Sequence, residues 1–218
     1  MTTKPFWSVF EGANSDLIAA AAQVWVRPDD RGMDVTWGTG RWKTNRHHRP
    51  ELFTKHDLKL DGVDFRRLPE PDGSVDCIYY DPPYISRGSD KSAALKPMYD
   101  SYGQEALKGW RPTIERVEAG LKECARVLAP GGRLFAKCGD GVESGHRRFA
   151  VFAVARACKE SGLTLVDLVV HQRGRPSPQP AGRQQQHSAM AHSFLLIAQK
   201  PPLVHPLKRK PKRKTTGV

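Results

Sequence analysis

Apolar positions along this chain switch between two spacings. Apolar residues three or four positions apart predict amphipathic helices in three segments, at 15–26, 113–128 and 147–162. Short runs rich in β-branched and aromatic residues predict strands at 32–40, 51–58, 74–80, 133–139, 163–171 and 192–199. This alternation of helices and strands is typical of an open α/β sheet with crossover helices.

The last two predicted strands have no helix between them. Residues 172–191 separate them and are polar and rich in Pro, Gln and Arg, which favours a long surface loop. The pattern therefore predicts a mostly parallel central sheet with an antiparallel last strand and helices on both faces. Ser15 is the predicted N-cap of the first helix.

One predicted strand ends in an unusual sequence. The strand at 74–80 is followed by Asp81, Pro82, Pro83 and Tyr84, which we call the DPPY segment. Proline cannot donate to a β-ladder, so the strand must end there. An acid, two prolines and an aromatic residue are an uncommon way to build a turn. The segment therefore indicates a functional site.

A second predicted strand ends in glycines. In "DVTWGTG", residues 34–40, Asp34 closes the strand and Gly38 and Gly40 follow; we call this segment the glycine turn. Glycine lets a ligand approach the backbone closely, although a lone G-x-G is more often a tight turn than a cofactor loop. In open α/β sheets ligands bind beyond the carboxyl ends of strands, so the two segments together predict one site.

Length and charge limit what this site can serve. A chain of 218 residues with 39% hydrophobic residues can bury one sizeable core, which predicts a single domain over residues 1–203. The net charge of +12 favours a polyanionic partner. Half of this charge lies in a tail, residues 204–218, that we expect to be disordered and that carries Lys208, Arg209, Lys210, Lys212, Arg213 and Lys214.

Cysteine spacing and hydropathy predict neither metal nor membrane. The four cysteines lie far apart and form no Cys-x-x-Cys pair, so the sequence signals neither a zinc site nor disulfides. The amino terminus lacks the apolar core of a secretory signal, and the longest apolar run is about half a membrane span. We expect a cytoplasmic protein with no membrane partner.

Several of these segments together resemble a known family, the S-adenosylmethionine-dependent DNA amino-methyltransferases, which methylate adenine N6 or cytosine N4. The DPPY segment looks like their catalytic motif. The glycine turn is similar to their cofactor motif D-P-F-x-G-x-G, with Thr36 where the family has Phe. Residues 62–84 and 128–140 resemble their catalytic and fifth-strand regions. The resemblance spans roughly residues 30 to 200 and implies a Rossmann-like class I methyltransferase fold.

The resemblance assigns the catalytic roles to the DPPY segment. The Asp81 carboxylate and the Pro82 carbonyl would accept the two N–H groups of a target amine, which localises the nitrogen lone pair for attack. The prolines, including Pro83, fix the backbone so that these acceptors point outward. Tyr84 would stack on a base extruded from the duplex. Transfer would be a direct in-line displacement that needs no metal.

The same resemblance assigns the cofactor, S-adenosylmethionine, to three strand ends. Methionine would lie over the glycine turn, at Asp34, Thr36, Gly38 and Gly40. Asp57, at the end of the next predicted strand, would bind the ribose hydroxyls, as acids do in dinucleotide folds. Asp64 is similar to the acid that accepts from the adenine amino group.

Two polar loops are the candidate nucleic-acid contacts, because the chain has no room for a separate recognition domain. Arginine and glutamine read base edges, whereas lysine mostly contacts phosphate. Together with the tail, the loops supply Arg87, Lys91, Lys96, Arg173, Arg175, Arg183, Lys208, Arg209 and Lys210.

The expected function is methyl transfer to adenine N6 in duplex DNA by base flipping, because DPPY is more typical of adenine enzymes. Three alternatives stay open at this point. They are a cytosine-N4 DNA methyltransferase, an RNA guanine-N2 methyltransferase, and a non-catalytic basic protein that binds nucleic acid on the same scaffold.

Overall fold

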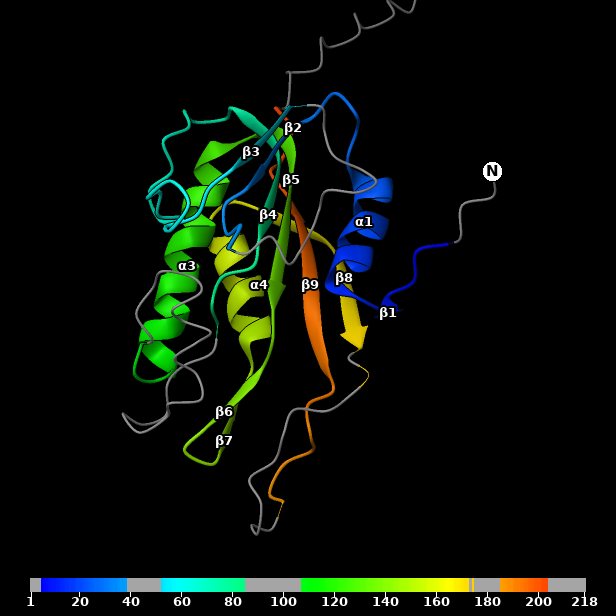
Figure 1. The fold of residues 1–218 in the computed structure, drawn as a ribbon, viewed down its shortest axis with the longest axis vertical. Coiled ribbons are helices and arrows are strands. Elements are labelled where there is room, and N and C mark those ends of the chain that lie inside the picture. Colours follow the sequence, from blue (N-terminus) through cyan, green and yellow to red (C-terminus); the bar gives the residue numbers. More distant parts are fainter. Residues whose placement is uncertain (1–4, 39–51, 85–106, 173, 175–184, 204–218) are drawn as a thin grey trace, which may run out of the picture.

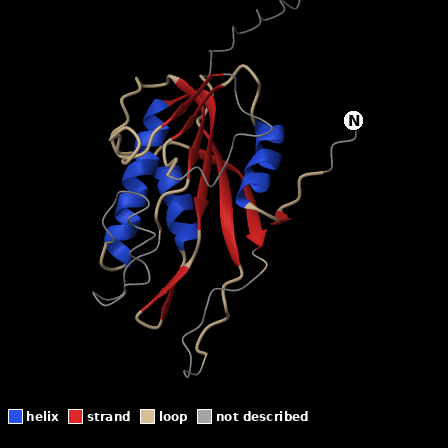
Figure 2. Ribbon diagram, in the orientation of Figure 1, coloured by secondary structure: helices blue, strands red, loops and turns tan. Residues whose placement is uncertain are grey.

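A seven-stranded sheet forms the centre of the computed structural model (Figures 1 and 2). The structure describes residues 5–38, 52–84, 107–172, 174 and 185–203. Its helices are α1 (Asn14–Trp25), α3 (Trp110–Val127) and α4 (Ala150–Glu160). The sheet contains β1 (Val9–Glu11), β2 (Arg31–Asp34), β3 (Leu52–Lys55), β4 (Val75–Tyr80), β5 (Leu128–Cys138), β8 (Thr164–Gln172) and β9 (His192–Gln199). A separate hairpin pairs β6 (Gly141–Glu143) with β7 (His146–Arg148).

The strand order is β1-β8-β9-β5-β4-β2-β3. Neighbouring strands are parallel except at β9, which runs antiparallel to both β5 and β8. This confirms the predicted mostly parallel sheet with an antiparallel last strand. The inversion arises because the chain passes from β8 to β9 without a crossover helix.

Helices cover both faces of the sheet, as predicted (Figure 1). The alternation of side chains along β4 serves both layers, because successive residues of a strand point to opposite faces. Cys77 and Tyr79 pack with Leu17 and Ile18 of α1 in one cluster. The other face packs against α3 and α4 through a larger cluster, and there Tyr80 donates a hydrogen bond from its hydroxyl to the carbonyl of Val117, at 2.9 Å.

Three local details differ from the sequence prediction. Helix α1 begins one residue earlier than expected, and Ala13 is its N-cap, so the prediction of Ser15 as the cap was wrong. The carbonyl of Ala13 accepts the N–H groups of Asp16 and Leu17, which starts the helix without a side-chain cap. Strand β1 and the β6–β7 hairpin were not predicted, because three-residue strands are too short to carry a periodic signal.

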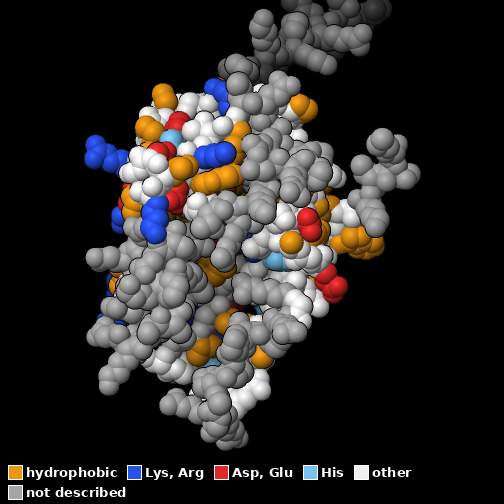
Figure 3. Space-filling view, viewed as in Figure 1, with side chains coloured by type: hydrophobic (Ala, Val, Ile, Leu, Met, Phe, Trp, Pro, Cys, Tyr) orange, Lys and Arg blue, Asp and Glu red, His pale blue; other side chains and the backbone are white. Residues whose placement is uncertain are grey.

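Charged side chains of both signs are interspersed on the face drawn in Figure 3, notably over the loop between β3 and β4. All four cysteines of the chain are buried and free. None of the helices in the described parts of the chain is long and apolar enough to cross a membrane.

Candidate active site

The two segments singled out in the sequence meet at the topological switch point of the sheet. From β2 the chain crosses to β3 on one side, and it then returns to β4 on the other side of β2. Asp34 is in register with Tyr79, so the glycine turn and the DPPY segment leave adjacent strands at the same edge. Crossovers that diverge in this way leave a crevice beyond the strand ends, which is where open α/β sheets bind ligands.

Thr36 joins the two segments by hydrogen bonds. The backbone N–H of Asp81 donates to the Thr36 hydroxyl oxygen at 2.8 Å. The backbone N–H of Thr36 donates in turn to the Asp34 carboxylate at 2.9 Å. Thr36, which stands where the family has Phe, therefore holds the DPPY segment against the glycine turn, a contact that phenylalanine could not make.

Asp57 reaches the glycine turn from β3. One of its carboxylate oxygens accepts the N–H of Gly38 at 2.9 Å, and the other accepts the N–H of Lys59 at 2.9 Å. Gly38 has a φ of 52°, in the left-handed region that glycine adopts without strain. The predicted ribose-binding acid thus also fixes the turn over which the cofactor was expected to lie.

Asp34 is the most perturbed of these acids. It is 2% exposed, and its burial raises its pKa to about 7. The hydrogen bond from Thr36 opposes this shift, while the negative charges of Asp81 and Asp57 add to it. Three carboxylates therefore converge around the glycine turn, and their mutual repulsion favours a positively charged ligand.

The Tyr84 ring lies against the chain that follows β5, at Gly139. Pro82 and Pro83 are buried, whereas Asp81 and Tyr84 are partly exposed. A Cβ atom added at Gly139 would lie 3.0 Å from the Tyr84 ring, so a larger residue there would crowd the ring. Sequence reasoning missed the role of Gly139, which only the pairing of β4 with β5 reveals.

Asp64 belongs to a different set of contacts. Both of its carboxylate oxygens accept from the Arg66 guanidinium, and one also accepts the Arg66 backbone N–H at 2.9 Å. Although burial alone would raise it, the pKa of Asp64 is lowered by these bonds. Its predicted contact with an adenine amino group stays a prediction and would have to share the carboxylate with Arg66.

His56 was missed in the sequence and supports Asp57. Its ring nitrogens lie 2.6 Å from Asp61 and 2.7 Å from Glu70. Burial disfavours the charged ring, yet the hydrogen bonds to these two carboxylates raise its pKa overall. Asp61 also accepts the backbone N–H of Asp57 at 3.1 Å. The histidine and its two acids therefore hold the chain at Asp57 in place.

Lys137 is a buried basic residue near the end of β5. It is 3% exposed and donates from Nζ to the Asn14 side-chain oxygen at 2.6 Å. This bond fastens the start of α1 to the carboxyl edge of the sheet.

Other predicted site residues lie outside the described part of the chain. Among the described residues, no group of three or more His, Cys, Asp or Glu side chains could hold a metal ion. The predictions that cannot be placed are Gly40, Arg87, Lys91, Lys96, Arg173, Arg175, Arg183, Lys208, Arg209 and Lys210.

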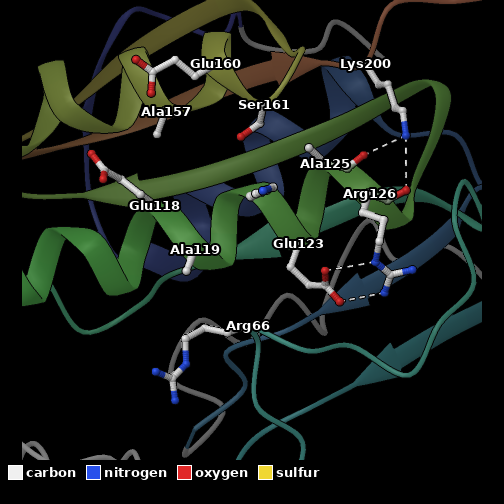
Figure 4. A pocket seen from close by; sticks show the side chains of 11 residues that line it. Arg66, Glu118, Ala119, Glu123, Ala125, Arg126, Ala157, Glu160, Ser161 and Lys200 are labelled. Atoms are coloured by element: carbon white, nitrogen blue, oxygen red, sulfur yellow. Dashed lines mark hydrogen bonds and ion pairs between the residues drawn. The ribbon is translucent and has the colours of Figure 1, made fainter.

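A cavity of about 880 Å³ lies apart from this site, between α3, α4 and the chain after β9 (Figure 4). Its polar groups bind one another. Arg126 pairs with Glu123 at 2.7 Å, and Lys200 donates to the carbonyls of Ala125 and Leu128 at the end of α3. These contacts satisfy carbonyls at the end of α3, so we assign this cavity a structural role.

Comparison with protein-family models finds no match, and comparison with the curated proteins finds none either. Among solved structures, the cyclase SpnF is similar at 16% identity over 86% of this chain and 80% of its own, with a TM-score of 0.52. A candidate exported protein from Bordetella parapertussis is similar at 14% identity over 86% of this chain and 67% of its own, with a TM-score of 0.50. These likenesses show a shared Rossmann-like α/β fold.

A candidate DNA modification methylase from Thermus thermophilus is similar at 18% identity, with a TM-score of 0.43. The match covers 67% of this chain but 56% of that one, so the present chain spans little more than half its length. The same Thermus protein has been solved in complex with S-adenosylmethionine. At this level of similarity the likeness carries no argument about activity.

Proposed function

We propose that the chain transfers a methyl group from S-adenosylmethionine to adenine N6 in DNA. The observation that carries this proposal is the Thr36 bridge, which bonds to the N–H of Asp81 on one side and to Asp34 on the other. It supports a single site in which a catalytic acid and a cofactor turn are joined by hydrogen bonds.

The acids around the glycine turn fit the proposed cofactor. S-adenosylmethionine supplies an electrophilic methyl group on a positively charged sulfonium and also carries an ammonium group and two ribose hydroxyls. Asp34, buried and repelled by its acidic neighbours, gains from any nearby positive charge. Asp57 holds Gly38 by one oxygen and has lone pairs left to accept from hydroxyls.

The DPPY segment fits an amine substrate. The lone pair of an exocyclic amine is delocalised into the ring, so the amine needs hydrogen-bond acceptors before it can attack. The Asp81 carboxylate and the Pro82 carbonyl supply two such acceptors, and the buried prolines hold them at the edge of the sheet. Methyl transfer would end with loss of one amine proton and with the sulfur keeping the pair of the broken S–C bond.

DNA and adenine are the finer parts of the proposal. The net charge of +12 supports a polyanionic substrate, and the partly exposed Tyr84 ring supports stacking on an extruded base. The choice of adenine rests on the resemblance of the DPPY segment to adenine enzymes.

Labelled cofactor tests the proposal directly. The chain is incubated with tritiated S-adenosylmethionine and either duplex DNA or RNA, and the nucleic acid is then digested to nucleosides. We expect the label in N6-methyldeoxyadenosine. Label in N4-methyldeoxycytidine or in an RNA guanosine would overturn the assignment of the base, and cofactor binding without any transfer would overturn catalysis.

A further inference from the structure

Helix α4 presents two aromatic side chains to solvent. Phe149, at its N-cap, is 51% exposed, and Phe152, in its first turn, is 69% exposed. Their rings lie 5.6 Å apart, centroid to centroid. Adjoining exposed rings form a contiguous apolar patch, which makes this face of α4 a candidate binding surface.

The exposed face of α4 has a regular composition. One stripe of the helix, at Val151, Val154 and Cys158, is buried in the core. The opposite stripe, at positions 149, 152 and 156, combines the two phenylalanines with an exposed Arg156. Because residues three and four apart share a face, the outer stripe is a continuous surface of two rings and one guanidinium.

Two more arginines border this surface on β7. Arg147 donates to the Ser188 carbonyl at 2.6 Å, and no described carboxylate pairs with it. Arg148 pairs with Glu143 at 3.2 Å, and Arg156 pairs with Glu118 at 2.9 Å and with Glu160 at 3.7 Å. A guanidinium has five N–H donors, so each of these arginines keeps donors for an outside acceptor.

The aromatic and basic residues line one groove of about 460 Å³. Helix α3 forms its other wall with Trp110 and Ile114. We call this groove and the outer stripe of α4 the Phe-Arg surface, lined by Trp110, Arg147, Arg148, Phe149, Phe152 and Arg156.

The Phe-Arg surface lies at the same edge of the sheet as the catalytic segment. Asp140, just after β5, accepts the N–H of Val151 in the first turn of α4. Its neighbour Gly139 is the residue on which the Tyr84 ring packs. A short, bonded stretch of chain therefore connects the base-stacking tyrosine to the exposed phenylalanines.

We propose that the Phe-Arg surface binds the DNA that carries the target base, with unpaired or distorted bases stacking on Phe149 and Phe152 and with Arg147 and Arg156 on the phosphates. This inference rests on the proposed function and deepens it. Aromatic rings flanked by arginines suit nucleic acid, because every base offers a flat face to stack and phosphates prefer guanidinium. The net charge of +12 favours the same polyanion.

Equilibrium binding tests the aromatic part. The affinity for a short fluorescein-labelled duplex with a mismatch is measured by anisotropy for wild type and for the double variant Phe149→Ala/Phe152→Ala. We expect about a tenfold loss of affinity, with most of it restored in Phe149→Tyr/Phe152→Tyr. Val24→Ala is the matched control, because Val24 is also exposed but lies at the end of α1, at the opposite edge of the sheet.

Salt dependence tests the arginines. Arg147→Gln and Arg156→Gln should each reduce the slope of log affinity against log salt by about 1, the effect of one lost phosphate contact. Arg27 is also exposed but lies away from the Phe-Arg surface, so Arg27→Gln should leave the slope unchanged. Thermal unfolding of every variant checks that the fold is intact, which we expect because the substituted side chains are on the surface.

The outcomes separate this inference from the proposed function. If the wild type binds DNA through these residues but transfers no methyl group, the Phe-Arg surface stands and the proposed function fails. If the protein methylates DNA while the surface variants bind like wild type, the surface proposal is overturned and the function stands. Tighter binding of RNA than of DNA through the same residues would overturn the assignment of the ligand.

Discussion

Two groups of acids lie within one part of the molecule and are held in different ways. At the strand ends, Asp34 and Asp57 accept backbone N–H groups, and no cationic side chain of the described residues pairs with either. In the loop after β3 and on α3, by contrast, carboxylates pair with His56, Arg66 and Arg126; these acids are Asp61, Asp64, Glu70, Asp72 and Glu123.

The difference separates acids whose charge already faces a cationic side chain from acids whose charge does not. A carboxylate that already faces a guanidinium or imidazolium gains little from a further cation, so the paired group mainly ties the loop to α3. A carboxylate that is buried among other acids and accepts only from neutral donors is stabilised when a cation binds beside it. The raised pKa of Asp34, about 7, is the signature of that difference.

The largest effect is expected from removing Asp81, the acid of the DPPY segment. Asp81→Ala should reduce the rate of methyl transfer at least about a hundredfold, because it deletes an acceptor for the developing charge. Cofactor binding, measured by calorimetry, should persist, because the glycine turn is untouched. The matched control from the paired group is Asp72→Ala, whose ion pair with Arg126 is largely exposed and contributes little. Wild-type turnover in Asp81→Ala would refute the catalytic assignment.

A second test exploits the pKa of Asp34. A cationic cofactor favours the ionised carboxylate, so binding should release a proton, and affinity should rise by up to about tenfold per pH unit below the pKa of about 7. Above that pH the affinity should level off. Asp34→Asn should bind more weakly and lose this pH dependence. Calorimetry in buffers of different ionisation enthalpy counts the protons, and an equal count for both proteins would contradict the prediction.

The Thr36 bridge allows a smaller and more local test. Thr36→Val keeps the shape but leaves the Asp81 N–H without its acceptor, which should cost about 1 to 3 kcal/mol of unfolding free energy. Thr36→Ser should retain most of the stability and activity. Thr54→Val, on the exposed side of β3, is the matched control. Denaturant titration measures the difference, and equal losses at positions 36 and 54 would show that the bridge contributes nothing.

The smallest effect is expected for the dependence of stability on pH that His56 and its two paired acids cause. Folding raises the pKa of His56, so its stabilisation is complete below its ordinary value of about 6.5 and is lost as pH rises through the folded value. Asp34 acts in the same direction, because its raised pKa also favours the protonated folded protein. The melting temperature of His56→Gln should therefore decline less than that of wild type between about pH 6 and 8. Parallel curves of melting temperature against pH for the two proteins would show that His56 does not cause the pH dependence.

Local pattern was enough to predict the sheet and the two segments at its switch point. The strand before Asp81 and the glycine turn after β2 carry strong signals, because β-branched runs and glycines are read within a few residues. Long-range pairing was not readable in this way. The Thr36 bridge joins residues 45 positions apart, and the pairing of Arg126 with Asp72 spans 54 positions.

The Phe-Arg surface was missed for a different reason. In sequence, Phe149 and Phe152 read as ordinary apolar positions of a helix, since hydrophobic residues are expected to face the core. Only the structure shows that α4 buries the stripe through Val154 and turns these rings outward. The signal was present in the helical spacing of positions 149, 152 and 156, where two phenylalanines share a face with an arginine.

The buried cysteines make the folded molecule unreactive toward thiol reagents, which experiments can use. Thiol reagents attack the thiolate, and burial raises the pKa of Cys77 and Cys158 to about 12 and that of Cys124 and Cys138 further still. A maleimide added to the folded chain should therefore label only molecules that have opened. A single cysteine introduced on the surface would then be the one reactive thiol of the folded protein. A fluorophore attached to it could report the kinetics of nucleic-acid binding.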